Sequence, residues 1–229
     1  MKEIYIYPHM QMGDQIIING LVRNLIKKYE KINFFVKDRN LESVKWMYRD
    51  LEKMTFLVVQ KEKQVDNYIK NNNITNCIKI GHEYRDKNIN FDQAFYKQFN
   101  IDFNKKWDDF YVQRDLNKEK SFFDRFSLKE NNYVVMHEDP YNPRGCYIIN
   151  RRLLPKNIDI FYITRNLTDN IFDYCYTIEN AKEIHIIESS FLFLIDVINT
   201  KGKLYDHKYA RSYPIDETPT LKKDWNILI

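Results

Sequence analysis

Glycine, proline and cysteine are all scarce in this chain. Its 229 residues include five glycines, six prolines and three cysteines. With so few glycines and prolines, the chain has no segment with the composition of a flexible linker. We therefore expect two halves of the chain to be closely docked. The cysteines are odd in number, form no CxxC pair and have no Cys/His ligand set around them, which argues against a disulfide framework or a zinc site. We therefore expect a reduced, cytoplasmic location. They are Cys77, Cys146 and Cys175.

Several other features are missing as well. No apolar run approaches the 18 residues of a membrane span, and the first residues resemble a strand rather than a basic leader followed by a cleavage site. There are no internal repeats. The net charge is only +4, from 36 basic and 32 acidic residues, and no recognisable nucleic-acid motif accompanies it. We expect a protein without a membrane-spanning segment that binds small anions rather than nucleic acid.

Strand patterns alternate with helix patterns along most of the chain, and 44% of its residues are hydrophobic. This alternation is typical of βαβ units and parallel sheets. We predict an α/β fold of two small Rossmann-like domains facing a cleft, with residues 1–115 and 116–229 as the domains. The predicted strands are 3–7, 32–37, 54–60, 76–81, 132–138, 159–164, 184–187 and 203–207. The predicted helices are 15–29, 41–51, 61–71, 91–99, 118–126, 170–181 and 191–199.

The first turn of the chain, residues 8–14, joins a predicted strand to a long helix. In an open α/β sheet such a turn lies at the carboxyl edge, where ligands bind, so Gly13 and Asp14 place a carboxylate beside helix amides. His9 and Gln15 flank the same turn. A simpler interpretation stays open, because Asp is also a favoured N-cap residue and Gly13 suits any tight turn.

A second turn with similar properties follows the apolar strand 184–187. Ser189 or Ser190 can cap the next helix, whose positive end suits phosphate oxygens. Glu188, just before them, can accept hydrogen bonds from ribose or sugar hydroxyls. An ordinary capped helix is the alternative interpretation.

Between these turns lies a third group of polar residues. His137 ends the strand 132–138, and Arg144, Arg151, Arg152 and Lys156 follow it. Arg144 or Arg152 could neutralise a nucleotide diphosphate through the guanidinium fork, although solvated surface charge is an equal alternative. Consecutive strand residues alternate sides, so His137 and its two acidic neighbours cannot share one metal ion.

An adjacent pair of acidic residues, Asp108 and Asp109, lies near the middle of the chain. Asp108 and Asp109 could be taken for metal-binding carboxylates, but they do not follow a buried strand. Their cationic neighbours, Lys105, Lys106 and Arg114, favour surface ion pairing instead.

Two segments resemble the heptosyltransferase-like glycosyltransferases, a GT-B family with two facing Rossmann-like domains. The first is Gly13-Asp14 with the Ile-rich helix that carries Leu21, Arg23 and Leu25. The second is 181–198, where a strand ends in an acidic residue, serine and a small residue before a helix. Ser190 replaces the usual glycine, and Phe193 and Leu194 lie where a histidine is often found. A full GT-B enzyme is usually longer, so this chain would be a minimal version.

This resemblance implies a function and a set of roles. Asp14 would be the catalytic base, with His9, Gly13 and Gln15 near the acceptor. Glu188, Ser189, Ser190, His137 and an arginine, Arg144 or Arg152, would bind the donor. The implied reaction is metal-independent and cofactor-free transfer of a sugar from a nucleotide sugar to a hydroxyl of a glycan acceptor. The alternatives are a non-catalytic sugar-nucleotide or glycan-binding module, or another nucleotide-sugar enzyme such as an epimerase. The absence of GxGxxG weakens a dinucleotide-dependent version of the latter.

Overall fold

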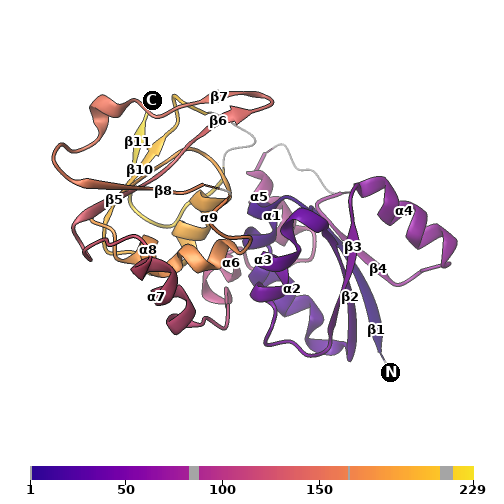
Figure 1. Cartoon of the computed structure of the whole chain (residues 1–229). Coiled ribbons are helices and arrows are strands. Elements are labelled where there is room, and N and C mark those ends of the chain that lie inside the picture. Colours follow the sequence, from indigo (N-terminus) through magenta and orange to yellow (C-terminus); the bar gives the residue numbers. More distant parts are fainter. Residues whose placement is uncertain (1, 83–87, 165, 212–218) are drawn as a thin grey trace. The chain divides into compact units, whose positions relative to one another are not determined.

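The computed structural model describes residues 2–82, 88–164, 166–211 and 219–229. The chain folds into two compact units (Figure 1). Unit 1 comprises Met1–Gln113 and Ile215–Thr220, and unit 2 comprises Arg114–Pro214 and Leu221–Ile229. Among the described residues, no helix is long and apolar enough to cross a membrane.

Unit 1 is built on a four-stranded parallel sheet. Its strands have the order β3-β2-β1-β4, which is the order of a Rossmann half. The predicted parallel sheet of the first half is therefore confirmed. The strands are β1 (Glu3–Pro8), β2 (Lys31–Lys37), β3 (Met54–Val59) and β4 (Cys77–Ile80). The helices are α1 (Met12–Ile17), α2 (Asn19–Leu25), α3 (Leu41–Met47), α4 (Glu62–Asn71), α5 (Phe91–Lys97) and α6 (Lys105–Asp108), with 3₁₀ turns η1 (Ile26–Lys28) and η2 (Asp38–Asn40).

The predicted helix 15–29 differs from the observed one in two ways. It begins three residues earlier, at Met12, and it breaks at Ile18. The break has a visible cause: the Tyr96 hydroxyl donates to the carbonyl of Ile17 and accepts from the amide of Leu21. A side chain has thus entered the helical hydrogen-bond ladder. Figure 1 shows α1 and α2 as separate segments.

Unit 2 contains a five-stranded parallel sheet with the order β11-β10-β9-β5-β8. Numbered within the unit, this is the doubly wound order of flavodoxin-like proteins. The predicted strands of the second half are confirmed. They are β5 (Tyr133–His137), β8 (Asp159–Tyr162), β9 (Glu183–Ile186) and β10 (Lys203–His207), joined by β11 (Trp225–Leu228). The helical segments are α7 (Leu116–Asp124), η3 (Arg151–Leu153), η4 (Ile171–Tyr174), α8 (Cys175–Glu179) and α9 (Ser190–Val197).

Three strands of unit 2 were not predicted. The hairpin of β6 (Asp139–Asn142) and β7 (Gly145–Tyr147) lies in a stretch rich in turn residues, and none of its strand residues is fully buried, so no apolar alternation marks it. The tail was expected only to pack back onto the body. Instead β11 pairs with β10 over four residue pairs and extends the sheet.

A buried ion pair lies inside unit 1. The Nζ atom of Lys106 is 2.8 Å from Oδ2 of Asp92, and both side chains are fully buried. Lys106 also donates to the carbonyl of Thr220, whose amide donates to Asp92. The ring of Trp107 lies 4.7 Å from Nζ. Surface ion pairing is therefore wrong for Lys106, because its side chain is fully buried and pairs there with Asp92.

We predict that Lys106→Met lowers the free energy of unfolding by about 3–5 kcal/mol, because Asp92 would remain buried without a counter-charge. Urea denaturation measures this loss. The matched control is Lys105→Met, which removes a half-exposed pair with Asp109 and should cost under about 1 kcal/mol. Asp92→Asn/Lys106→Met should recover part of the loss. Equal losses of unfolding free energy in Lys106→Met and Lys105→Met would contradict the prediction.

Candidate functional site

The carboxyl edge of the unit 1 sheet has one topological switch point, between β1 and β4. The chain leaves β1 for β2 on one side and later places β4 on the other, and ligands of open α/β sheets bind beyond strand ends arranged in this way. His9 follows β1, and its amide donates to the carbonyl of Ile80 at the end of β4. The ring of His82 lies 4.0 Å from that of Tyr7 and 5.0 Å from that of His9. These contacts bring the ends of both strands together.

Asp14 reaches this edge from the first turn of α1. Its Oδ2 atom is 3.6 Å from Nδ1 of His9, and 15% of its side chain is exposed. The Gln15 side chain donates to the carbonyl of His9. The structure therefore brings together three of the predicted residues, His9, Asp14 and Gln15, and Gly13 adjoins them in the same turn of α1. The expected N-cap role of Asp14 is wrong, because Gln11 occupies that position with extended backbone.

Sequence reasoning did not identify His82 as part of this group. Burial lowers the pKa of His82, and its Nε2 atom lies 3.2 Å from the carbonyl of Pro8. Gly81 precedes it with a φ of +82°, and a Cβ there would lie 2.4 Å from the ring of Phe95. The sequence did carry a signal: His82 directly follows the fourth predicted strand, 76–81, which the switch-point rule pairs with the first.

The carboxyl edge of the unit 2 sheet has its switch point between β5 and β9. Here the amide of Ile187 donates to the carbonyl of His137, and the His137 ring lies 4.7 Å from that of Phe191. Ser189 is the N-cap of α9, and its hydroxyl accepts from the amide of Phe191. Capping by one of the two serines was predicted, and Ser189 fills that role. The structure thus places His137, Ser189 and, between Ile187 and the cap, Glu188 at one edge of the sheet.

Two carboxyl groups at this edge are almost fully buried. Glu188 follows β9, and Asp206 lies near the end of the neighbouring strand β10; each is 2% exposed. Burial, and then the charge of Glu188, raise the pKa of Asp206 to about 7. Among the described residues, no hydrogen-bond partner exists for its Oδ1 atom. Asp206 was missed because the strand 203–207 was assigned a purely structural role.

The cations around this edge differ in their positions. Arg151 forks onto the carboxylate of Glu138, directly after β5, at 2.5 and 2.8 Å. This pairing lowers the pKa of Glu138 against the opposing effect of its burial. Arg144 lies in the turn of the β6–β7 hairpin and Arg152 in η3, and both side chains are exposed. Arg151 is therefore the arginine that the structure ties to the strand ends.

A chain of hydrogen bonds runs through the interior beside Asp206. Nδ1 of His185 lies 2.9 Å from Nε2 of His207, whose Nδ1 lies 2.9 Å from the hydroxyl of Tyr209. Nε2 of His185 lies 3.3 Å from the carboxylate of Glu183. One proton arrangement satisfies the whole chain: Tyr209 donates to His207, His207 to His185, and His185 to Glu183, with both imidazoles neutral. Burial lowers the pKa of His185, and burial with the neighbouring imidazole lowers that of His207 to about 4.

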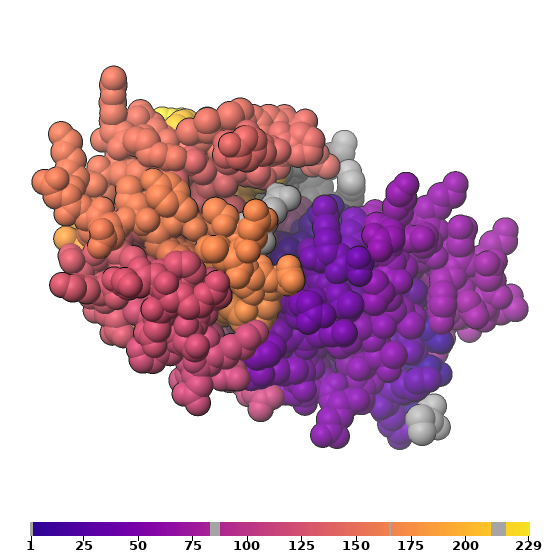
Figure 2. Space-filling model, in the orientation of Figure 1, coloured from indigo at the N-terminus to yellow at the C-terminus, as the bar shows by residue number. Residues whose placement is uncertain are grey.

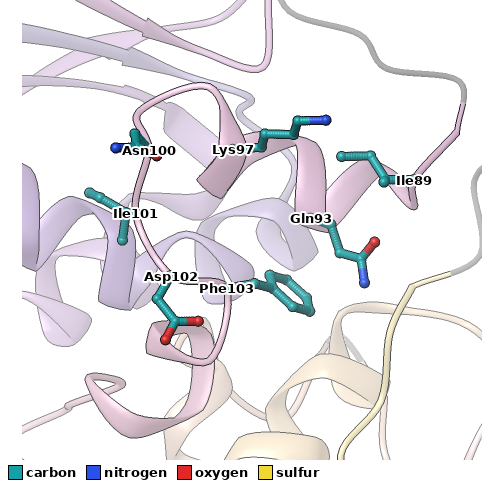
Figure 3. A pocket seen from close by; sticks show the side chains of 7 residues that line it. All are labelled: Ile89, Gln93, Lys97, Asn100, Ile101, Asp102 and Phe103. Carbon is teal, nitrogen blue, oxygen red and sulfur yellow. The ribbon is translucent and has the colours of Figure 1, made fainter.

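Two surface hollows contain none of the predicted site residues. The first lies between α5 and the loop that follows it, and Figure 3 shows Gln93 and Lys97 on its helical side. The second lies beside Gly202 and Lys223, at the amino ends of β10 and β11. That end of the sheet is opposite to the carboxyl edge.

No cluster of three or more potential metal ligands exists within the described residues. Asp109, one member of the acidic pair, lies 3.2 Å from Nζ of Lys105 and accepts from the side chain of Asn24 at 2.7 Å. These contacts agree with the ion-pair interpretation for Asp109.

Comparison with known proteins gives a clear result for the fold. No protein-family model and no curated protein matches the sequence. Among solved structures, a glycosyl transferase family 9 protein from Veillonella parvula DSM 2008 has a TM-score of 0.63 at 9% identity, covering 99% of this chain and 86% of that one. E. coli ADP-heptose LPS heptosyltransferase II has a TM-score of 0.62 at 10% identity, covering 100% and 90%. The iron-containing dodecameric glycosyltransferase TibC from enterotoxigenic E. coli H10407 has a TM-score of 0.57 at 12% identity, covering 96% and 61%.

These likenesses extend over nearly the whole chain. The chain therefore has the heptosyltransferase-like fold of two Rossmann-like units that its two turns predicted. Likenesses at 9–12% identity establish the fold alone, so the chemistry has to be inferred from the residues at the strand ends.

We predict that His207 destabilises the folded state progressively as the pH falls. Its pKa is about 4 in the folded protein against an ordinary 6.5, so between these values the unfolded chain binds a proton that the folded chain does not. The unfolding free energy of the wild type minus that of His207→Gln should fall by about 1–3 kcal/mol between pH 7 and pH 4.5. Urea denaturation at a series of pH values measures this difference.

Asp206→Asn provides the comparison of opposite sign. The folded-state pKa of Asp206 is raised to about 7, so the folded chain binds the extra proton and the wild type gains stability relative to Asp206→Asn as the pH falls from 7 to 4. Stability differences that are flat with pH for both variants would show that neither buried group titrates as described.

Proposed function

We propose that this protein is a glycosyltransferase that moves a sugar from a nucleotide sugar to a hydroxyl of a glycan acceptor. One observation carries the proposal. The two turns singled out from the sequence both lie at topological switch points, one in each unit, and each supplies an acidic side chain. The fold shared with solved glycosyltransferases supports the same conclusion.

The donor would bind to unit 2. Glu188 is a buried acceptor and suits the hydroxyls of a sugar or ribose, whereas its charge disfavours a phosphate placed directly against it. The diphosphate would instead lie between Ser189 and Ser190 at the N-terminus of α9 and a cation from the segment after β5. Arg144 and Arg152 have exposed guanidinium groups for this purpose, and Arg151 is already directed to the edge by Glu138. His137 would contact the donor between these groups.

The acceptor would bind to unit 1, beside His9, Gly13 and Gln15. Asp14 would remove the proton of the acceptor hydroxyl as that oxygen forms a bond to the anomeric carbon. The bond from the anomeric carbon to the phosphate oxygen would break, and the nucleoside diphosphate would leave with the bonding electrons. Helix amides and cations of unit 2 would stabilise that charge, so the step would need neither a metal ion nor a cofactor.

A second candidate is a non-catalytic module that binds sugar nucleotides or glycans. The observation in its favour is the replacement of motif residues: Ser190 for glycine, and Phe193 and Leu194 where a histidine is often found. Turnover separates the two candidates. The three free cysteines support a cytoplasmic location for either one.

We predict that Asp14→Asn reduces sugar transfer by at least about 100-fold while nucleotide binding is unchanged, because the amide keeps the shape but cannot accept the proton. A thermal-shift screen with nucleoside diphosphates and their sugar conjugates first identifies the donor, since a ligand of the folded state raises the unfolding temperature. Transfer is then measured as release of the nucleoside diphosphate in the presence of acceptor.

The matched control is Asp66→Asn, an exposed carboxylate on α4. It should transfer at the wild-type rate. Normal transfer by Asp14→Asn would rule out its role as base. A screen without a stabilising nucleotide would contradict the donor assignment, and binding without any transfer would favour the second candidate.

A further inference from the structure

Residues 149–154 carry two of the candidate donor cations, and we call them the arginine segment. Figure 2 shows the salmon-coloured part of unit 2 to which they belong. The first and last side chains of the segment are buried in one hydrophobic cluster, with side chains from β5 and from the residue after β9. The members of this cluster are Met136, Ile149, Leu154 and Ile187. Between these anchors Arg151 and Arg152 are exposed, so the backbone that joins the anchors determines where both guanidinium groups start.

Arg152 is the arginine of this segment whose charge is not already compensated. Arg151 forks onto the carboxylate of Glu138, whereas the guanidinium of Arg152 is exposed and no described residue pairs with it. The backbone of Arg152, by contrast, is firmly held. Asn150 is the N-cap of η3: its side chain accepts from the amide of Arg152 at 3.1 Å, and its carbonyl accepts from the amide of Leu153 at 3.0 Å. The position of Arg152 therefore follows that of Asn150.

Asn150 is held in turn by Tyr209. The amide of Asn150 donates to the Tyr209 hydroxyl at 2.7 Å. Tyr209 follows the carboxyl end of β10, and its own amide donates to the carbonyl of Leu228 in β11 at 3.1 Å. This backbone hydrogen bond ties Tyr209 to the sheet, so its hydroxyl is a fixed point to which the arginine segment is bonded.

The chain of imidazoles between Tyr209 and Glu183 fixes the direction in which that hydroxyl donates. At one end the amide of Asn150 can only donate, and at the other end the carboxylate of Glu183 can only accept. Both ends therefore require every proton of the chain to point toward Glu183, so Tyr209 donates to His207 and keeps a lone pair for Asn150. His185 is 1% exposed and His207 is 0% exposed, so water does not compete for the hydrogen bond between them.

We propose that Tyr209 is a positioning residue for Arg152, and that the two buried imidazoles hold Tyr209 in this role. The inference rests on the proposed donor site, in which Arg152 contacts the diphosphate. A side chain on an already ordered backbone loses less conformational freedom when a ligand binds, so the hydrogen-bonded chain strengthens binding of the phosphates without touching them. The nucleoside part of the donor gains nothing from this chain, because Glu188 rather than Arg152 would hold the ribose.

The experiment is calorimetric titration of the whole chain with ADP, GDP, CDP, UDP and dTDP, and with the nucleoside of each. Tyr209→Phe keeps the ring and removes only the hydroxyl. We expect it to bind the diphosphate that the wild type binds about fivefold more weakly, with the matching nucleoside unaffected, because one hydrogen bond is lost on the phosphate side alone. The matched control is Tyr205→Phe, since the ring of Tyr205 stacks on His185 at 4.3 Å but its hydroxyl is outside the chain. It should bind both ligands like the wild type.

A double-substitution series shows whether Tyr209 acts through Arg152. Arg152→Gln should also weaken diphosphate binding, and adding Tyr209→Phe to it should cause no further loss. Both side chains are exposed, and circular dichroism checks that the variants fold. Losses that multiply, normal diphosphate binding by either single variant, or equal weakening of nucleoside and diphosphate would each overturn this proposal while the donor site stands. A wild type that binds none of the diphosphates would instead refute the proposed donor site, and this inference with it.

Discussion

Reversal of strand order within a parallel sheet is the constraint on which the candidate site depends. At β1 and again at β5, the chain first adds strands on one side of the starting strand and later on the other, so the loops after the two flanking strands lead away in opposite directions. His9, Asp14 and His82 lie at the first of these sheet edges, and His137 and Glu188 at the second. The same topological event thus occurs twice, and each time it brings together side chains from distant parts of the sequence.

Buried polar groups then fix the elements around these two sheet edges. The Tyr96 hydroxyl enters the backbone ladder between α1 and α2, next to the turn that carries Asp14, and Lys106 with Asp92 holds Thr220 in unit 1. In unit 2, buried Asp206 lies within the electrostatic influence of Glu188, and the linked imidazoles of His185 and His207 lie on β9 and β10. These groups are expensive to bury without partners, so they specify the positions of the strand ends more sharply than apolar packing alone would.

The sequence predicted the parallel strands because their signal is local: Ile184 and Ile187 flank an apolar run that suits a strand buried on both faces. It also located Asp14 and Glu188, since each follows such a strand. It could not reveal the break at Ile18, which is caused by Tyr96 from 78 positions away, nor the burial of Lys106, because both depend on tertiary contacts. The hairpin β6–β7 was not predicted for another reason: its short strands contain no fully buried residue and no alternation of apolar and polar residues. His82 and Asp206 were recognisable only once the order of the strands was known.

The most direct test is a crystal structure of the protein with a bound nucleoside diphosphate. The central claim is that the carboxyl edge of the unit 2 sheet, at its switch point, binds the donor nucleotide. It predicts the ribose or sugar side of the ligand at Glu188 and its phosphates at the N-terminus of α9. A ligand bound elsewhere on the protein would contradict it.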